Sequence, residues 1–174
     1  LKFYQISFSL PDYYENYNIP EFFPHPTHGN GPLAWGHPGF SMGYRHMCRF
    51  FTGEIYKQPQ LGKYDYYMRM DTDSFILGPV NYDVFYYMKQ NNKNYGYIAR
   101  AVQHDNPKVI EGLWGTSSKW YEKNDTLCIR SPSQIPEGMM YYTNFEIGDI
   151  KWFRNSTYMD YYHFLDKEGG INTD

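Results

Sequence analysis

The stretch Tyr64-Asp65-Tyr66-Tyr67-Met68-Arg69-Met70-Asp71-Thr72-Asp73 places an acidic triplet directly after an alternating segment. From 64 to 70 the side chains alternate between two kinds, which is typical of a strand with two unequal faces. The predicted strand runs straight into the pair of carboxylates. In open α/β sheets, ligands bind beyond the carboxyl ends of the strands. The pair therefore lies where a ligand site is expected.

Helices and strands are predicted on both sides of this segment. A helix is expected over 42–56, capped by Ser41 and stopped by Pro59, followed by a short helix over 83–91 and a strand over 95–102. A further helix is expected over 109–123, and strand character over 140–153 with an interruption at 146–149. The last helix is expected to run from an Asn155 or Ser156 cap to Gly169-Gly170. This alternation favours an α/β layered sheet. Residues 1–40 are rich in proline, glycine and aromatics, so we expect them to be irregular.

The composition excludes some partners and favours another. The net charge is −3 and no basic patch is present, which argues against nucleic acid. No run of ~18 apolar residues occurs, so nothing in the chain is expected to span a membrane. Tyrosine is abundant, with 20 residues. Such rings can stack on sugars while their hydroxyls bond sugar oxygens; the alternative is that they fill the core.

Asp71 and Asp73 are the candidate metal ligands. Carboxylates bind hard divalent cations such as Mn²⁺ or Mg²⁺, which can bridge to phosphate oxygens. A nucleotide-sugar donor needs such an ion, because its diphosphate leaving group gains charge as the bond breaks. The alternative is a solvated turn after the strand.

Other charged residues are candidates for catalysis and donor binding. Glu146 lies among apolar residues, where a carboxylate can act as nucleophile, base or cation stabiliser; it could equally be a surface residue or a partner for Arg154. Arg45 and Arg49 share a helix face and suit a diphosphate. Alternatively, the two arginines pair with acids such as Asp65 or Asp71 in a structural network.

Four blocks together resemble one known family. They are Tyr44-Arg45-His46-Met47-Cys48-Arg49-Phe50, Tyr64-Asp65-Tyr66-Tyr67-Met68-Arg69 before the acidic pair, Thr143-Asn144-Phe145-Glu146-Ile147-Gly148 and Leu165-Asp166-Lys167-Glu168-Gly169-Gly170. In order and spacing they are similar to the fungal α-1,2-mannosyltransferases, also called glycolipid 2-α-mannosyltransferases. The resemblance covers about residues 41 to 171. We therefore expect a single partial catalytic domain over 1–174.

The resemblance implies a GT-A type glycosyltransferase fold, GDP-mannose as donor, Mn²⁺ as cofactor, a mannose-containing glycan as acceptor and retention of configuration. It assigns Tyr44 and Glu146 to the catalytic site and Asp71 to the metal position, with Asp73 two residues on. It also implies acceptor contacts from His104, Asp105 and Trp114; the alternative for His104 and Asp105 is that they belong to a surface turn. It implies a location in the Golgi or secretory-pathway lumen, and any membrane anchor is expected outside this chain.

The chain also departs from the family. Asp71 stands where the family has the glutamate of a Glu-Pro-x triplet, and Thr72 replaces the proline. The family's metal-binding histidine follows the point at which this chain stops, and its guanosine-binding strands are not evident in 1–40, so we expect a fragment. Two other functions stay open, namely a non-catalytic sugar-binding module and an inactive relative that keeps the fold.

Overall fold

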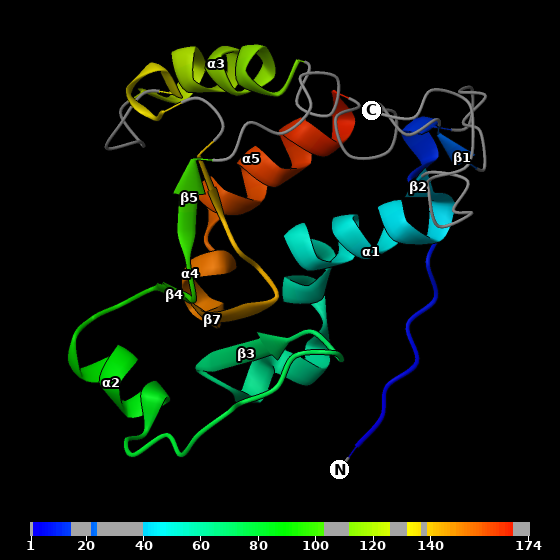
Figure 1. The fold of residues 1–174 in the computed structure, drawn as a ribbon. Coiled ribbons are helices and arrows are strands. Elements are labelled where there is room, and N and C mark those ends of the chain that lie inside the picture. The colour runs from blue at the N-terminus through cyan, green and yellow to red at the C-terminus, as the bar shows by residue number, and fades with distance from the viewer. Residues whose placement is uncertain are drawn as a thin grey trace.

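The computed structural model describes residues 2–14, 22–23, 40–102, 112–125, 132–136 and 139–168. Figure 1 shows a small sheet with helices on either side. The helices are α1 (Met42–Thr52), α2 (Val84–Gln90), α3 (Leu113–Asn124), α4 (Ile150–Phe153) and α5 (Ser156–Lys167), with 3₁₀ turns at Asp12–Tyr14, Glu54–Lys57, Pro59–Lys63 and Pro132–Gln134. The strands are β1 (Phe22–Phe23), β2 (Phe40–Ser41), β3 (Tyr66–Met70), β4 (Tyr95–Tyr97), β5 (Arg100–Val102), β6 (Met139–Tyr141) and β7 (Phe145–Asp149).

The main sheet has the strand order β3-β7-β4, and β7 is antiparallel to both neighbours. β3 and β4 therefore run in the same direction, and α2 lies in the connection between them. Met70 pairs with Phe145, and Tyr97 pairs with Glu146. This register brings the carboxyl ends of β3 and β4 to the amino end of β7, so the acidic triplet and Glu146 share one edge of the sheet.

Two smaller pairs complete the strands, β1 with β2 and β5 with β6. All pairs in the described ranges are antiparallel. α3 packs on α5, where the rings of Trp120 and Tyr161 lie 5.0 Å apart and Ser117 is hydrogen-bonded to Tyr161 at 2.8 Å. α5 lies between α3 and α1 in Figure 1.

Several predicted boundaries differ from the observed ones. The first helix ends at Thr52 instead of continuing to 56, and Gly53 packs directly under the ring of Tyr162. The predicted strand character over 140–153 is divided between β6, β7 and α4, and the interruption predicted at 146–149 is wrong, because β7 runs through these residues. α4 begins where it does because the Asp149 carboxylate accepts the N–H of Trp152 at 2.9 Å and caps the new helix.

An aromatic core lies on one face of the main sheet. It contains Tyr56, Tyr67, Ile150 and Phe153, and the rings of Tyr56 and Phe153 are stacked with centroids 4.6 Å apart. On β3 it is Tyr67 that is buried, while Met68 and Met70 on the opposite face are exposed. Gly148 pairs with Tyr67 across the ladder and leaves the space that this ring fills.

We predict that Gly148→Ala destabilises the fold by about 1–3 kcal/mol or more, as overpacking of a core does. A Cβ at this position would lie 2.3 Å from Cε1 of Tyr67 and 2.7 Å from Cε2 of Phe153. Both rings belong to the core, so neither can move away cheaply. Chemical denaturation measures the difference. Gly78→Ala is the control, because a Cβ there meets no atom within 4 Å, and equal stability of the two variants would contradict the prediction.

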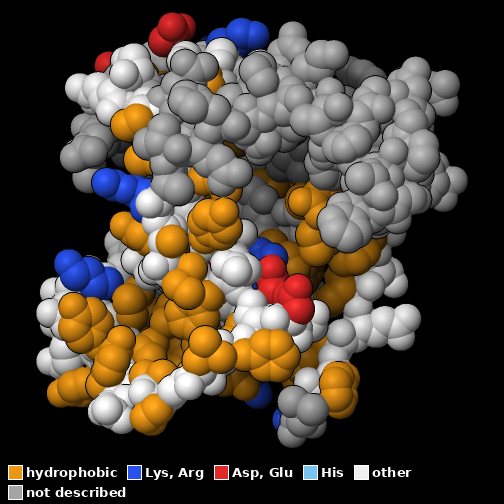
Figure 2. All heavy atoms as spheres, in the orientation of Figure 1, with side chains coloured by type: hydrophobic (Ala, Val, Ile, Leu, Met, Phe, Trp, Pro, Cys, Tyr) orange, Lys and Arg blue, Asp and Glu red, His pale blue; other side chains and the backbone are white. Residues whose placement is uncertain are grey.

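Hydrophobic side chains also gather on the surface over the region of β3 and α2 (Figure 2). The connection between these elements includes Phe75 and Leu77, which are 80% and 97% exposed. Tyr82, Tyr86 and Tyr87 are exposed in the same segment. Among the described helices, none has the length and apolar character required to cross a membrane.

Candidate functional site

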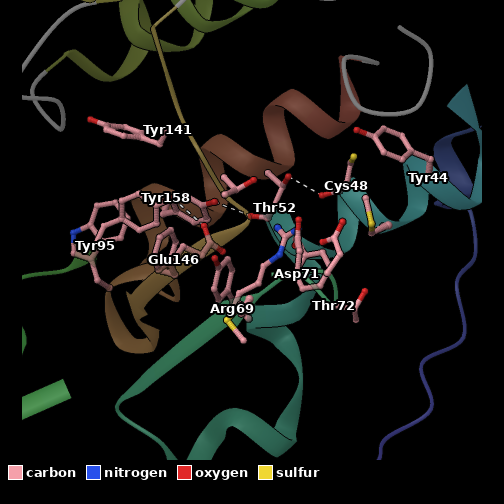
Figure 3. Close-up of a pocket in the computed structure, with 18 residues that line it drawn as sticks. Tyr44, Cys48, Thr52, Arg69, Asp71, Thr72, Tyr95, Tyr141, Glu146 and Tyr158 are labelled. Atoms are coloured by element: carbon pink, nitrogen blue, oxygen red, sulfur yellow. Dashed lines mark hydrogen bonds and ion pairs between the residues drawn. The ribbon is translucent and has the colours of Figure 1, made fainter. Parts of the chain in front are cut away.

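A cavity of about 1040 Å³ opens at the edge where β3, β4 and β7 bring their polar ends together (Figure 3). α1 forms one wall, and the segments around β6 and α4 form another. The described residues that line the cavity are Tyr44, Met47, Cys48, Phe51, Thr52, Tyr56, Arg69, Met70, Asp71, Thr72, Asp73, Tyr95, Tyr141, Thr143, Glu146, Trp152, Phe153 and Tyr158. Four of the predicted site residues, Tyr44, Asp71, Asp73 and Glu146, are therefore brought together.

Asp71 lies at the end of β3, as the sequence predicts. Its backbone N–H donates to the carbonyl of Asn144 at 2.9 Å, and its own carbonyl accepts the N–H of Ser74 at 3.0 Å. These two bonds fix a turn after the strand and hold the triplet at the mouth of the cavity. Asp73 lines the same cavity and is exposed.

Arg69 is a cavity residue that the sequence analysis missed. Its Nη2 donates to Oδ1 of Asp71 at 3.1 Å, and its guanidinium lies 3.9 Å from the centre of the Phe51 ring. Residues two apart on a strand share a face, so the position of Arg69 two residues before Asp71 was the available signal. The pair places one positive charge beside the carboxylates.

The acidic triplet fits a divalent cation in part. Asp71 and Asp73 offer the hard oxygen ligands that Mg²⁺ and Mn²⁺ prefer. In the ranges that the structure describes, no group of three histidine, cysteine, aspartate or glutamate side chains could hold a metal. Such ions commonly bind through one or two carboxylates, with waters and substrate phosphates completing the shell. The two aspartates are therefore a suitable but incomplete ligand set.

Glu146 lines the cavity and is only 6% exposed, so we call this buried part of the lining the floor of the cavity. Its Oε1 accepts the hydroxyl of Tyr67 at 3.1 Å, and its Oε2 accepts that of Tyr95 at 2.8 Å. Arg154 instead donates to the backbone carbonyls of Tyr56 and Gln58. Neither alternative for Glu146 therefore holds, since it is neither a surface residue nor the partner of Arg154.

Tyr44 is in the first turn of α1, which Ser41 caps by accepting the N–H of Tyr44 at 3.1 Å. The ring is 47% exposed and lines the cavity. In Figure 3, Tyr44 and Asp71 lie on one side of Glu146, and Tyr95 and Tyr141 lie on the other. Glu146 thus separates an acidic end of the cavity from an aromatic end.

The structure does not support the predicted donor-binding role of Arg45 and Arg49. Neither is among the described residues that line the cavity. The Arg49 Nε lies 3.0 Å from both carboxylate oxygens of the fully buried Asp166, and its Nη2 lies 3.3 Å from Glu54. Arg45 is also buried. The structural-network alternative is therefore correct for Arg49, although its partners are not the expected Asp65 or Asp71.

Of the three predicted acceptor residues, Trp114 lies within the described part of the chain. His104 and Asp105 lie outside the described residues. Trp114 is in α3, does not line the cavity, and has a buried indole Nε1 without a hydrogen-bond partner among the described residues. The aromatic end of the cavity is formed instead by Tyr95, Tyr141, Trp152, Phe153 and Tyr158. With tyrosine so abundant, no spacing in the sequence singled these residues out.

Comparison with known sequences matches the chain to one family. The family described as glycolipid 2-alpha-mannosyltransferase matches residues 37–173. The probable mannosyltransferase KTR3 of Saccharomyces cerevisiae is 33% identical over 170 residues, which cover 90% of this chain and 42% of that protein. Glycolipid 2-alpha-mannosyltransferase 1 of Candida albicans is 35% identical over 142 residues, which cover 76% of this chain and 32% of that protein.

Solved structures agree with this match. Core-mannan synthase A (CmsA/Ktr4) from Aspergillus fumigatus, in its Mn/GDP form, superposes with a TM-score of 0.67 at 29% identity, over 76% of this chain and 40% of that one. Ktr4p from S. cerevisiae in complex with GDP superposes with a TM-score of 0.66 at 30% identity, over 75% of this chain and 37% of that one. The chain spans less than half the length of these relatives, and the expected GT-A type fold, present in part, is confirmed. The chain belongs to the glycolipid 2-alpha-mannosyltransferase family, the fungal enzymes that its four sequence blocks resemble.

Proposed function

We propose that this chain forms part of a retaining α-1,2-mannosyltransferase that moves mannose from GDP-mannose to a mannose-containing glycan. The observation that carries the proposal is the single cavity at which Asp71 and Asp73 lie at one end, Glu146 lies on the floor and aromatic rings form the other end. A transferase for sugar nucleotides needs these three parts, because it must bind a diphosphate, stabilise a cationic sugar and hold an acceptor.

At the acidic end, Asp71 and Asp73 are the residues that would hold Mn²⁺. The relative from A. fumigatus is described in a Mn/GDP form. A divalent cation supplies positive charge that neutralises a departing diphosphate. Arg69 contributes a second, permanent positive charge at the same end, since its guanidinium already lies 3.1 Å from Asp71.

On the floor, Glu146 presents a carboxylate toward the space between the two ends. A sugar that loses its leaving group develops positive charge at the anomeric carbon and ring oxygen. A carboxylate held in a water-poor environment stabilises that charge more than it would in bulk water. Tyr44 lies at the rim nearer to the acidic end, where its hydroxyl can reach the departing diphosphate or the sugar.

We predict that the full-length protein transfers mannose from GDP-mannose, that EDTA abolishes the transfer and that added Mn²⁺ restores it. The dependence on metal follows because the two aspartates and the diphosphate are all negatively charged. Among the described residues that line the cavity, Arg69 is the only positively charged side chain, and it is already paired with Asp71. A panel of nucleotide sugars, with a mannoside acceptor and product analysis by NMR, measures donor preference, linkage and anomeric configuration. Preference for a UDP-sugar would refute the donor assignment, and glycan binding without nucleotide binding would favour a sugar-binding module.

A further inference from the structure

The Glu146 carboxylate is held at both oxygens by hydroxyls from the two strands that flank it. Tyr67 comes from β3 and Tyr95 from β4, and both residues pair with Gly148 in the ladder. Glu146 and Gly148 are two apart on β7 and so share a face of the sheet. Each ring therefore crosses diagonally over the glycine to reach the carboxylate, a span that aromatic side chains can bridge between neighbouring strands.

A third tyrosine extends this arrangement into the core. The hydroxyl of Tyr56 lies 2.9 Å from that of Tyr67, and both residues are buried. Because the Tyr67 hydrogen is directed to Glu146, the hydrogen between the two tyrosines comes from Tyr56. The Tyr56 ring is in turn stacked on Phe153. The chain of hydrogen bonds from Tyr56 through Tyr67 to Glu146 is thus anchored in the aromatic core.

The tyrosines can act only as donors to Glu146 at ordinary pH. Burial, together with the neighbouring Glu146 charge, raises the pKa of Tyr67 and of Tyr95 well above the usual value. Both hydroxyls therefore keep their hydrogens. A buried carboxylate is costly unless it accepts hydrogen bonds, and bonds to an ionised acceptor are stronger than neutral ones. Two such bonds, one on each oxygen, fix the rotation of the carboxylate.

We propose that Tyr67 and Tyr95 are positioning residues for mannosyl transfer, which hold the Glu146 carboxylate directed at the anomeric carbon of the donor. The inference rests on the proposed function of Glu146. Tyr67 and Tyr95 act through Glu146, and the Tyr67 hydroxyl is itself oriented by Tyr56. Removing one hydroxyl leaves the carboxylate in place but free to turn, so its charge is no longer aligned with the charge that develops in the transition state.

Tyr95→Phe is the cleaner test, because no other buried tyrosine depends on its hydroxyl. We expect kcat to fall about 10–100-fold, the effect that loss of one hydrogen bond to a charged group produces. The KM for GDP-mannose and the melting temperature should stay near their wild-type values. For Tyr67, the double variant Tyr56→Phe/Tyr67→Phe removes both hydroxyls at once and avoids an unpaired buried donor. Tyr66→Phe is the control, since it removes a hydroxyl on the opposite face of β3, away from the cavity.

A double-mutant cycle separates positioning from a structural effect. In a Glu146→Gln background, Tyr95→Phe should cost less than about 3-fold in residual turnover, because the group that it positions has lost its charge. An equal loss in both backgrounds, or wild-type kcat in Tyr95→Phe, would overturn the inference while leaving the proposed function intact.

A spectroscopic measurement is independent of transfer. The infrared difference between wild type and Glu146→Gln isolates the Glu146 carboxylate stretch. We expect that band to shift in Tyr95→Phe and to stay in place in Tyr66→Phe. An unshifted band in Tyr95→Phe overturns the inference even if the wild-type protein transfers no sugar, whereas inactivity of the wild type with a shifted band overturns only the proposed function.

Discussion

Glu146→Gln is expected to lower the turnover of mannosyl transfer by at least about 10²–10³-fold, the loss typical of a single electrostatic contributor, while GDP binding stays nearly intact. Glutamine keeps the size of the side chain and removes its charge. The carboxylate is 6% exposed and accepts hydrogen bonds from Tyr67 and Tyr95, so water cannot replace the charge easily. Steady-state kinetics and GDP titration calorimetry measure the two quantities. A still larger loss would favour the nucleophilic route through a covalent mannosyl-enzyme, and near-normal turnover would remove Glu146 from the mechanism.

Asp149→Asn is the matched control for this experiment. Asp149 is on the same strand, pairs with Tyr66 at the far end of β7 and caps α4 by accepting the N–H of Trp152. Asparagine caps helices about as well as aspartate, so turnover should stay near the wild-type value. This position also shows that Asp149, the next carboxylate in the sequence, lies too far along the strand to take over the role of Glu146.

The second large effect is expected for Asp73→Ala, which should reduce transfer below detection and weaken Mn²⁺ binding in the presence of GDP. Asp73 is preferable to Asp71 as a target because replacing Asp71 also releases Arg69 from its 3.1 Å ion pair. Removing one of two carboxylate ligands takes away both charge and a coordination position. Electron paramagnetic resonance of bound Mn²⁺ measures the affinity separately from activity.

Asp65→Ala provides the comparison for the metal site. Asp65 precedes the other end of β3, where it is exposed and lies 3.3 Å from Lys89. Exposed pairs of this kind contribute little to stability. We expect both Mn²⁺ affinity and turnover to be unchanged in this variant. If Asp73→Ala and Asp65→Ala have the same Mn²⁺ affinity and the same turnover, the acidic triplet is excluded as the metal site.

Local sequence patterns predicted the parts of the site but not how they meet. The alternation before Asp71 correctly indicated β3. The apolar neighbours of Glu146 indicated strand character around it, but the interruption predicted at 146–149 is where β7 runs. The strand register that places Arg69 opposite Glu146, however, depends on β7 lying between β3 and β4. That arrangement joins residues 77 positions apart in the chain (146 − 69), and the alternation of a strand says nothing about which strand lies beside it.

The errors have physical causes of the same kind. The partner of Arg49 was missed because Asp166 is 117 residues away, on α5. Strand character is predicted to continue to 153 because the apolar pattern runs past Asp149, although the helix cap at Asp149 changes the backbone there. The resemblance to the family, in contrast, identified Tyr44, Asp71 and Glu146 together, since blocks that recur in order carry information about contacts that periodicity lacks.

Gly148 has a consequence that extends beyond the packing of Tyr67. The ring that fills the space above this glycine belongs both to the aromatic core and to the support of Glu146. Many enzymes carry their reactive groups on segments that open locally while the rest stays folded. Here the reactive carboxylate and the rings of the aromatic core form one packed unit. The floor of the cavity therefore cannot loosen by itself, and any conformational change in the catalytic cycle has to come from the walls and rim around it.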